Sequence, residues 1–264
     1  MQHPGRDQFF AEISDSAARL ADIVRTRDPD LPVPACPAWT LRQLAGHVGR
    51  VHRWAAEIVS TRSAEYIPFD SVPDGRYPAE AADRAAWVTA GADRVIAAIA
   101  GAEDAPVWAF GRLAPATFWA RRQSHETMVH RADAELAIGG DVALDAGLAA
   151  DGIDEWLNLA TGARRQGDGS APLPPGAALR VQVTGPGHSP SWRVASGLAG
   201  LTLERGPEST GGPDQDARDA VTVSGPAGPL LLVLLRRRPA AGEPSVTVAG
   251  DGALLRGWLA GTPF

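Results

Sequence analysis

Apolar residues recur at helical spacing in four successive stretches of the first half of the chain. In residues 7–27 the pattern includes Phe10, Ile13, Ala17, Leu20 and Val24. Such spacing predicts an α-helix with one buried face. Residues 40–59, 79–100 and 115–138 show comparable patterns, and Thr40 is a predicted N-cap. Because each apolar face must be covered by another element, the four stretches predict a four-helix bundle with long loops at 68–78 and 101–114.

The second half of the chain changes character. A fifth helix is expected over residues 148–163, and the Gly- and Pro-rich residues 167–178 have the composition of a linker. Short strands follow at 179–184, 191–195, 201–205, 220–224 and 245–249, with a long polar loop at 206–219 and helices at 226–236 and 252–259. We therefore predict a two-domain α+β protein, with a helical bundle over 1–166 and a small α+β domain over 179–264.

Composition excludes several classes of function. The 264 residues carry a formal charge of −6 and contain no Lys, so no basic surface for nucleic acid is expected. The longest apolar run, residues 229–235, is too short to span a bilayer, and the N-terminus has no apolar segment followed by a cleavage site. Cys36 is the single cysteine, which rules out an intrachain disulfide. We expect a cytoplasmic protein that binds neither nucleic acid nor membranes.

Histidines are concentrated in two of the predicted bundle helices. His47 lies on the second helix, at the inward edge of its apolar stripe, and His130 lies on the fourth. Glu126 precedes His130 by four residues, so both side chains share one helix face and can reach one ion. Two His and one carboxylate leave a coordination position open, which is typical of catalytic rather than structural zinc sites.

Spacing alone leaves a second interpretation open. Glu126 and His130 could be an ordinary surface pair, and His47 a core histidine, because ExxxH is frequent in helices by chance. Asp133, one turn beyond His130, either orients a ligand or lies at the bundle surface. His52 and His125 are expected to be partly exposed at helix edges rather than to support a ligand, and Cys36 is expected to be structural.

Two segments resemble a known family. CPAWTLRQLAGHVGRVHRW, residues 36–54, and SHETMVHRADAELAIGG, residues 124–140, are similar to the mycothiol-dependent maleylpyruvate isomerase family. The resemblance implies a DinB-like bundle for the N-terminal domain. It also implies that His47, Glu126 and His130 are the ligands of a divalent metal, with zinc first and nickel or iron as alternatives.

The resemblance extends to the C-terminal segments VSGPAGPLLLVLLRRR and VTVAGDGALLRGWL. They look like the small α+β domain of that family, which is similar to sterol-carrier folds. In the family an arginine of this segment serves the active site. The nearest match is Arg237, with Arg236 and Arg238 as rivals.

The function implied by the resemblance is that of a metal-dependent isomerase or thiol S-transferase. Its cosubstrate would be mycothiol and its substrate a small electrophile such as an unsaturated carboxylate, with Arg237 on the substrate. Two alternatives stay open: a thiol-independent metal-dependent hydrolase or lyase, and a non-catalytic small-molecule binding protein. A monomer and a homodimer are equally compatible with the sequence.

Overall fold

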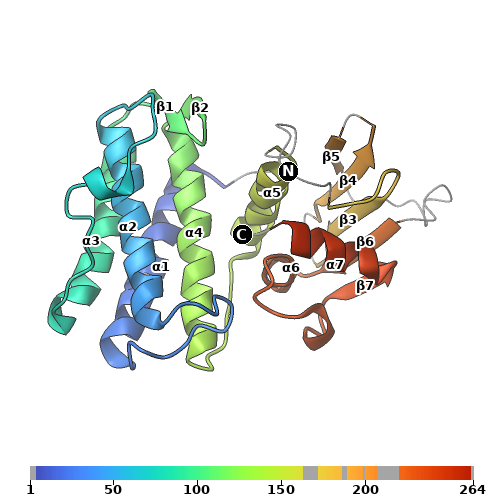
Figure 1. Cartoon of the computed structure of the whole chain (residues 1–264), viewed down its shortest axis with the longest axis horizontal. Coiled ribbons are helices and arrows are strands. Elements are labelled where there is room, and N and C mark those ends of the chain that lie inside the picture. Colours follow the sequence, from blue (N-terminus) through green and yellow to red (C-terminus); the bar gives the residue numbers. More distant parts are fainter. Residues whose placement is uncertain (1–3, 163–171, 186–188, 199, 207–219, 263–264) are drawn as a thin grey trace. The chain divides into compact units, whose positions relative to one another are not determined.

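The computed structural model describes residues 4–162, 172–185, 189–198, 200–206 and 220–262. The chain divides into two compact units, one of residues 4–143 and the other beginning at Leu144 (Figure 1). None of the helices in the described ranges is both long and apolar enough to cross a membrane.

The N-terminal unit is the predicted four-helix bundle. Its helices are α1 (Arg6–Thr26), α2 (Leu41–Ser60), α3 (Ala81–Ala100) and α4 (Thr117–Ala137). α1 packs against α3 and α4, and α2 packs against the same two helices. The predicted N-cap is confirmed, because the Thr40 hydroxyl accepts from the Gln43 amide while the Gln43 side chain accepts from the Thr40 amide at 2.8 Å. This capping box fixes where α2 begins and therefore which of its residues face inward.

A close contact between α2 and α3 depends on glycine. A Cβ built on Gly49 would lie 2.2 Å from the Trp87 ring, so only glycine fits beneath this indole. The buried Arg53 guanidinium lies 3.9 Å from the Trp87 ring centroid and donates to Gly49 O and to Asp74. Through Asp74, the Arg53 side chain holds the loop that follows α2 against the face formed by α2 and α3.

The predicted loop at 101–114 instead contains a β-hairpin. Strands β1 (Pro106–Ala109) and β2 (Arg112–Pro115) pair antiparallel, and Phe110 and Gly111 turn the chain with positive φ. The hairpin is fixed from outside, because Trp108 N donates to Ser63 O and Trp119 Nε1 donates to Trp108 O. Strands of four residues give too short a periodic signal to be distinguished from a loop.

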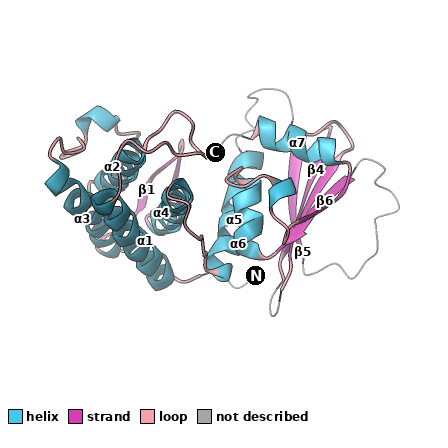
Figure 2. Ribbon diagram, turned by 90° about the horizontal axis from the view of Figure 1, so that it is seen from below, coloured by secondary structure: helices cyan, strands magenta, loops and turns pink. Residues whose placement is uncertain are grey.

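The C-terminal unit is the predicted small α+β domain. Its five-stranded sheet has the order β5-β4-β3-β6-β7, in which β3 and β6 are parallel and the other neighbours antiparallel. Helices α5, α6 and α7 lie on one face of the sheet (Figure 2). The elements are α5 (Ala146–Gly162), β3 (Ala178–Val183), β4 (Ser191–Gly197), β5 (Gly200–Gly206), β6 (Ala220–Gly225), α6 (Ala227–Leu234), β7 (Thr247–Gly250) and α7 (Gly252–Gly261). The α+β two-domain class predicted from the sequence is confirmed.

The fifth helix belongs to the C-terminal unit, whereas it was predicted to be part of the N-terminal domain. The boundary was expected at residue 166, but α5 packs against α6, β4 and β5, and the units divide before Leu144. Trp192 Nε1 donates to the buried Asp154 on α5 at 2.9 Å, and Trp156 packs edge-on against Trp258 of α7. An apolar stripe reveals a helix but not which core covers it. Of the predicted linker, residues 167–171 lie outside the described residues, whereas 172–178 form a turn that leads into β3 and buries Leu173 and Ala177. The predicted polar loop lies outside the described residues from 207 to 219.

Candidate metal centre

Three side chains from two bundle helices converge on one point. His47 comes from α2, and Glu126 and His130 come from α4, one turn apart. Glu126 Oε1 lies 2.9 Å from His47 Nε2 and 3.2 Å from His130 Nε2. One donor atom from each residue lies within 4.8 Å of the other two. The structure thus brings together all three residues that the sequence analysis put forward, while their role as metal ligands stays a prediction.

Two further residues hold this triad in place. Asp133 is fully buried, and its Oδ2 lies 2.8 Å from His130 Nδ1, so His130 donates through Nδ1 and turns Nε2 toward Glu126. Arg122, also buried, forms an ion pair with Glu126 Oε2, so that Oε1 is the oxygen that faces the two histidines. Asp133 is therefore buried behind His130 and not at the bundle surface, one of the two positions that the sequence left open. Its part in orienting a metal ligand stays a prediction.

The carboxylates also set the charge of the triad. Burial opposes the charged form of His130, but hydrogen bonds to Asp133 and Glu126 prevail and raise its pKa to about 9. Burial likewise disfavours ionised Glu126, yet Arg122 and the two imidazoles hold the pKa of Glu126 well below its usual range. Without a metal, His130 is therefore an imidazolium between two carboxylates.

This arrangement fits a divalent metal. In the metal-free protein Glu126 Oε1 is approached by two ring nitrogens, and a cation placed among the same three atoms would replace the protons between them. Two imidazoles and one carboxylate oxygen suit zinc, and also nickel and iron. With His130 and Glu126 each held by a second residue, the ligand set is already oriented.

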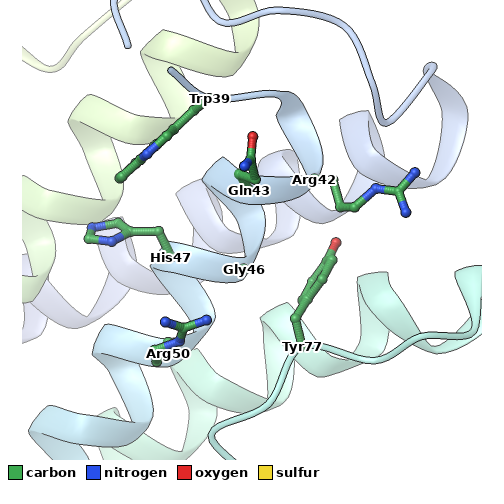
Figure 3. A pocket seen from close by; sticks show the side chains of 7 residues that line it. All are labelled: Trp39, Arg42, Gln43, Gly46, His47, Arg50 and Tyr77. Carbon is green, nitrogen blue, oxygen red and sulfur yellow. The ribbon is translucent and has the colours of Figure 1, made fainter. Parts of the chain in front are cut away.

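The triad is open on the side of His47. The His47 side chain is 31% exposed, against 6% for His130. Trp39 covers part of this opening, with its ring centroid 4.8 Å from that of His47. Next to it lies a hollow of about 330 Å³, lined by Trp39, Arg42, Gln43, Gly46, His47, Arg50 and Tyr77 (Figure 3). This hollow therefore adjoins the exposed side of the triad. Of the tryptophans, Trp39 lines this hollow, whereas Trp54, Trp108 and Trp119 pack against one another.

Cys36, which was expected to be structural, lies next to the residues that surround His130. Its Sγ is 3.8 Å from Asp133 Oδ2, and Cys36, His130 and Asp133 form a second group of potential ligands within 4.8 Å of one another. This group shares His130 with the triad, but its Asp133 faces Nδ1 of that ring, whereas Glu126 faces Nε2. Sequence spacing gave no signal for this approach, which joins residues 97 positions apart.

The other two helix histidines lie in the core. His52 is 0% exposed and His125 is 3% exposed, so the expectation of partly exposed helix-edge positions is wrong for both. His52 Nε2 lies 2.8 Å from the Thr127 hydroxyl oxygen. Because that hydroxyl donates its own proton to Gln123 O, His52 Nε2 must be the donor in this hydrogen bond. Burial lowers the pKa of His52 to about 3, and the ring stays neutral. Neither ring is part of the ligand triad.

The predicted arginine lies in the C-terminal unit, just after α6. Arg237 is half-buried and its Nη1 donates to Leu235 O at 2.8 Å. Of its rivals, Arg238 pairs with Glu243 at 2.8 Å, and Arg236 is exposed with φ of 61°. The role of Arg237 toward a substrate stays a prediction.

Comparison with known proteins finds a matching family model and two solved structures of similar fold. Residues 10–135 match the family model of the mycothiol maleylpyruvate isomerase N-terminal domain. Two crystal structures of mycothiol-dependent maleylpyruvate isomerase, one of them a histidine-to-alanine variant, share the fold of the whole chain. The variant aligns with a TM-score of 0.59 and the other structure with 0.56. Each is 15% identical, and each match covers 95% of this chain and 97% of the other. No curated protein sequence matches the chain.

Proposed function

We propose, from the match of residues 10–135 to the mycothiol maleylpyruvate isomerase N-terminal domain, that this chain is a metal-dependent enzyme of that family with a thiol cosubstrate. The observation that carries the proposal is the convergence of His47, Glu126 and His130 within 4.8 Å. The cosubstrate we propose is mycothiol, and the substrate is a small electrophile such as an unsaturated carboxylate. The metal we propose is zinc.

A divalent metal with three protein ligands supplies an open coordination position at which a thiol loses its proton near neutral pH. The protein's own residues prepare this position. Arg122 keeps Glu126 ionised and engaged through Oε2, and Asp133 keeps His130 turned toward the centre. Trp39 covers part of the open side and limits the access of water.

The reaction class follows from the nucleophile. When the thiolate sulfur adds to one carbon of a conjugated double bond, the remaining single bond can rotate. Expulsion of the same sulfur restores the double bond in the other geometry, which is cis–trans isomerisation. If the adduct is instead protonated and released, the enzyme is an S-transferase. In both cases we assign Arg237 to a substrate carboxylate or to the enolate oxygen that develops during addition.

Metal content and thiol dependence test the proposal together. The purified protein should contain close to one equivalent of zinc by elemental analysis. His47→Ala and His130→Ala should lose it, whereas the core variant His52→Gln should retain it. The metal-loaded protein should then convert an unsaturated carboxylate only in the presence of mycothiol, and Arg237→Met should lower this activity more than Arg236→Met.

Each contrary result points to a specific alternative. Turnover without any thiol would replace the proposal with metal-assisted hydrolysis or lyase chemistry, in which water occupies the open position. A folded protein that takes up no zinc, nickel or iron would make it a non-catalytic binding protein.

A further inference from the structure

The hollow beside His47 is cationic although the chain as a whole is acidic. Arg42 and Arg50 are among the seven residues that line it, and none of the seven carries a carboxylate. The formal net charge of the chain is −6. Excess positive charge in a concave surface raises the local concentration of anions.

Arg50 is the cation that is available to a ligand. Its side chain is exposed, and within the described part of the chain it has no ion pair. Arg42, by contrast, is held by Asp30 at 2.9 Å. Arg50 also lines a second hollow of about 640 Å³ with Asp70, Asp74 and Arg76, but no hydrogen bond joins Arg50 to any of them, and Asp74 pairs with Arg53. Since Arg50 follows His47 by three residues on α2, the two side chains lie on neighbouring positions of one helix face.

Two buried polar atoms in the wall of the hollow lack a partner among the described residues. They are the Tyr77 hydroxyl and Arg42 Nε. A buried donor without an acceptor is costly and points to an acceptor that occupies the site in the working protein. Figure 3 shows Tyr77 across Gly46 from His47, with its hydroxyl end toward Arg42. Both donors are buried, so a ligand in the hollow would reach them only with a shift of the Arg42 side chain away from Asp30.

The hollow is shaped for a small ligand. A Cβ on Gly46 would meet the Tyr77 ring at 3.4 Å, so a longer side chain at this position would fill the space between Tyr77 and His47. The volume of about 330 Å³ is at the lower end for small-molecule sites. Guanidinium groups bind carboxylates through paired hydrogen bonds, which fixes the orientation of the ligand as well as its position.

We propose that this hollow is the subsite for a carboxylate group of the substrate, with Arg50 as its principal cation and Tyr77 and Arg42 as further donors. The inference rests on the proposed function, because the proposed function identifies the ligand as the substrate. The subsite would hold the carboxylate end of that substrate, beside the proposed metal position. It does not involve Arg237.

Maleate binding to the zinc-loaded protein tests the subsite. Titration calorimetry should show binding to wild type, and Arg50→Met should weaken it about 10- to 100-fold, the effect of losing hydrogen bonds to a charged group. Arg50→Lys should fall between the two, and Tyr77→Phe should weaken binding about three- to tenfold. Arg62→Met is the matched control, because this exposed residue lies beyond the C-terminal end of α2, which is about 15 Å from Arg50 along the helix axis. This variant should bind maleate as wild type does. Zinc content should be the same in all these proteins.

The outcomes separate the subsite from the proposed function. Equal maleate affinity of wild type and Arg50→Met would overturn the subsite even if zinc and thiol-dependent turnover are both present. Failure of zinc-loaded wild type to bind maleate would also overturn it. If the protein held no metal but bound maleate in an Arg50-dependent way, the subsite would stand and the proposed function would fall.

Discussion

Metal affinity is expected to fall steeply as the pH is lowered, because His130 must release a proton to become a ligand. Its pKa in the metal-free protein is raised to about 9, so near neutral pH almost every molecule carries this proton. A metal binds only the neutral imidazole. Binding near pH 7 should therefore release close to one proton from His130 alone.

The size of the effect follows from the same pKa. Below pH 9 each pH unit costs about a factor of ten in affinity, which corresponds to about 1.4 kcal/mol. Between about pH 8 and pH 6 the contribution of His130 is roughly 90-fold. A histidine with an ordinary pKa of about 6.5 would contribute only about fourfold over that range. The difference between these two figures measures the influence of Asp133 and Glu126 on His130.

Competition with a chromophoric chelator gives the zinc affinity at each pH. Asp133→Asn is the informative variant, because it removes a buried charge while the amide oxygen can still accept from Nδ1. Its affinity near pH 8 should drop about 10- to 100-fold, and its dependence on pH should become shallower than that of wild type. A wild-type change below about tenfold between pH 8 and pH 6, or identical slopes for the two proteins, would refute the reasoning.

Three further predictions concern stability. Gly49→Ala should lower the free energy of unfolding, measured by urea denaturation, by about 1–3 kcal/mol, because its Cβ would lie 2.2 Å from Trp87. The control Gly101→Ala should lose little stability, because the nearest contact of its Cβ would be 3.5 Å. Equal losses in the two variants would contradict the packing argument. His52 stays neutral in the folded state, so its contribution to stability is complete above about pH 6.5 and is lost as the pH falls toward 3. Between pH 6.5 and pH 5 wild type should lose about 1.6 kcal/mol more than His52→Gln, and parallel pH profiles in urea would count against a buried neutral ring. Chelation of the metal should lower the midpoint of thermal unfolding by about 5 °C or more, and an unchanged midpoint would show that no tightly bound ion had been removed.

Local features of the chain were sufficient to predict its elements. The bundle helices begin and end within two residues of the predicted bounds, because apolar spacing and the Thr40–Gln43 capping box are properties of neighbouring residues. The Glu126–His130 pair was visible for the same reason, since one helical turn joins the two residues. The hairpin at Pro106–Pro115 was missed, because its short strands depend on contacts with Ser63 and Trp119 rather than on their own sequence.

The sequence by itself determined which segments form helices and strands, and which residue types could bind a metal. Only the tertiary structure decided which of these residues meet. It brought His47 to Glu126 across 79 positions, gave Asp133 its place behind His130, and moved α5 to the C-terminal unit. The physical reason is that the spacing of apolar residues shows which face of a segment is buried, but not which other segment covers that face. The partners are chosen by packing between distant segments, and the distances and pKa shifts of the site arise from those contacts.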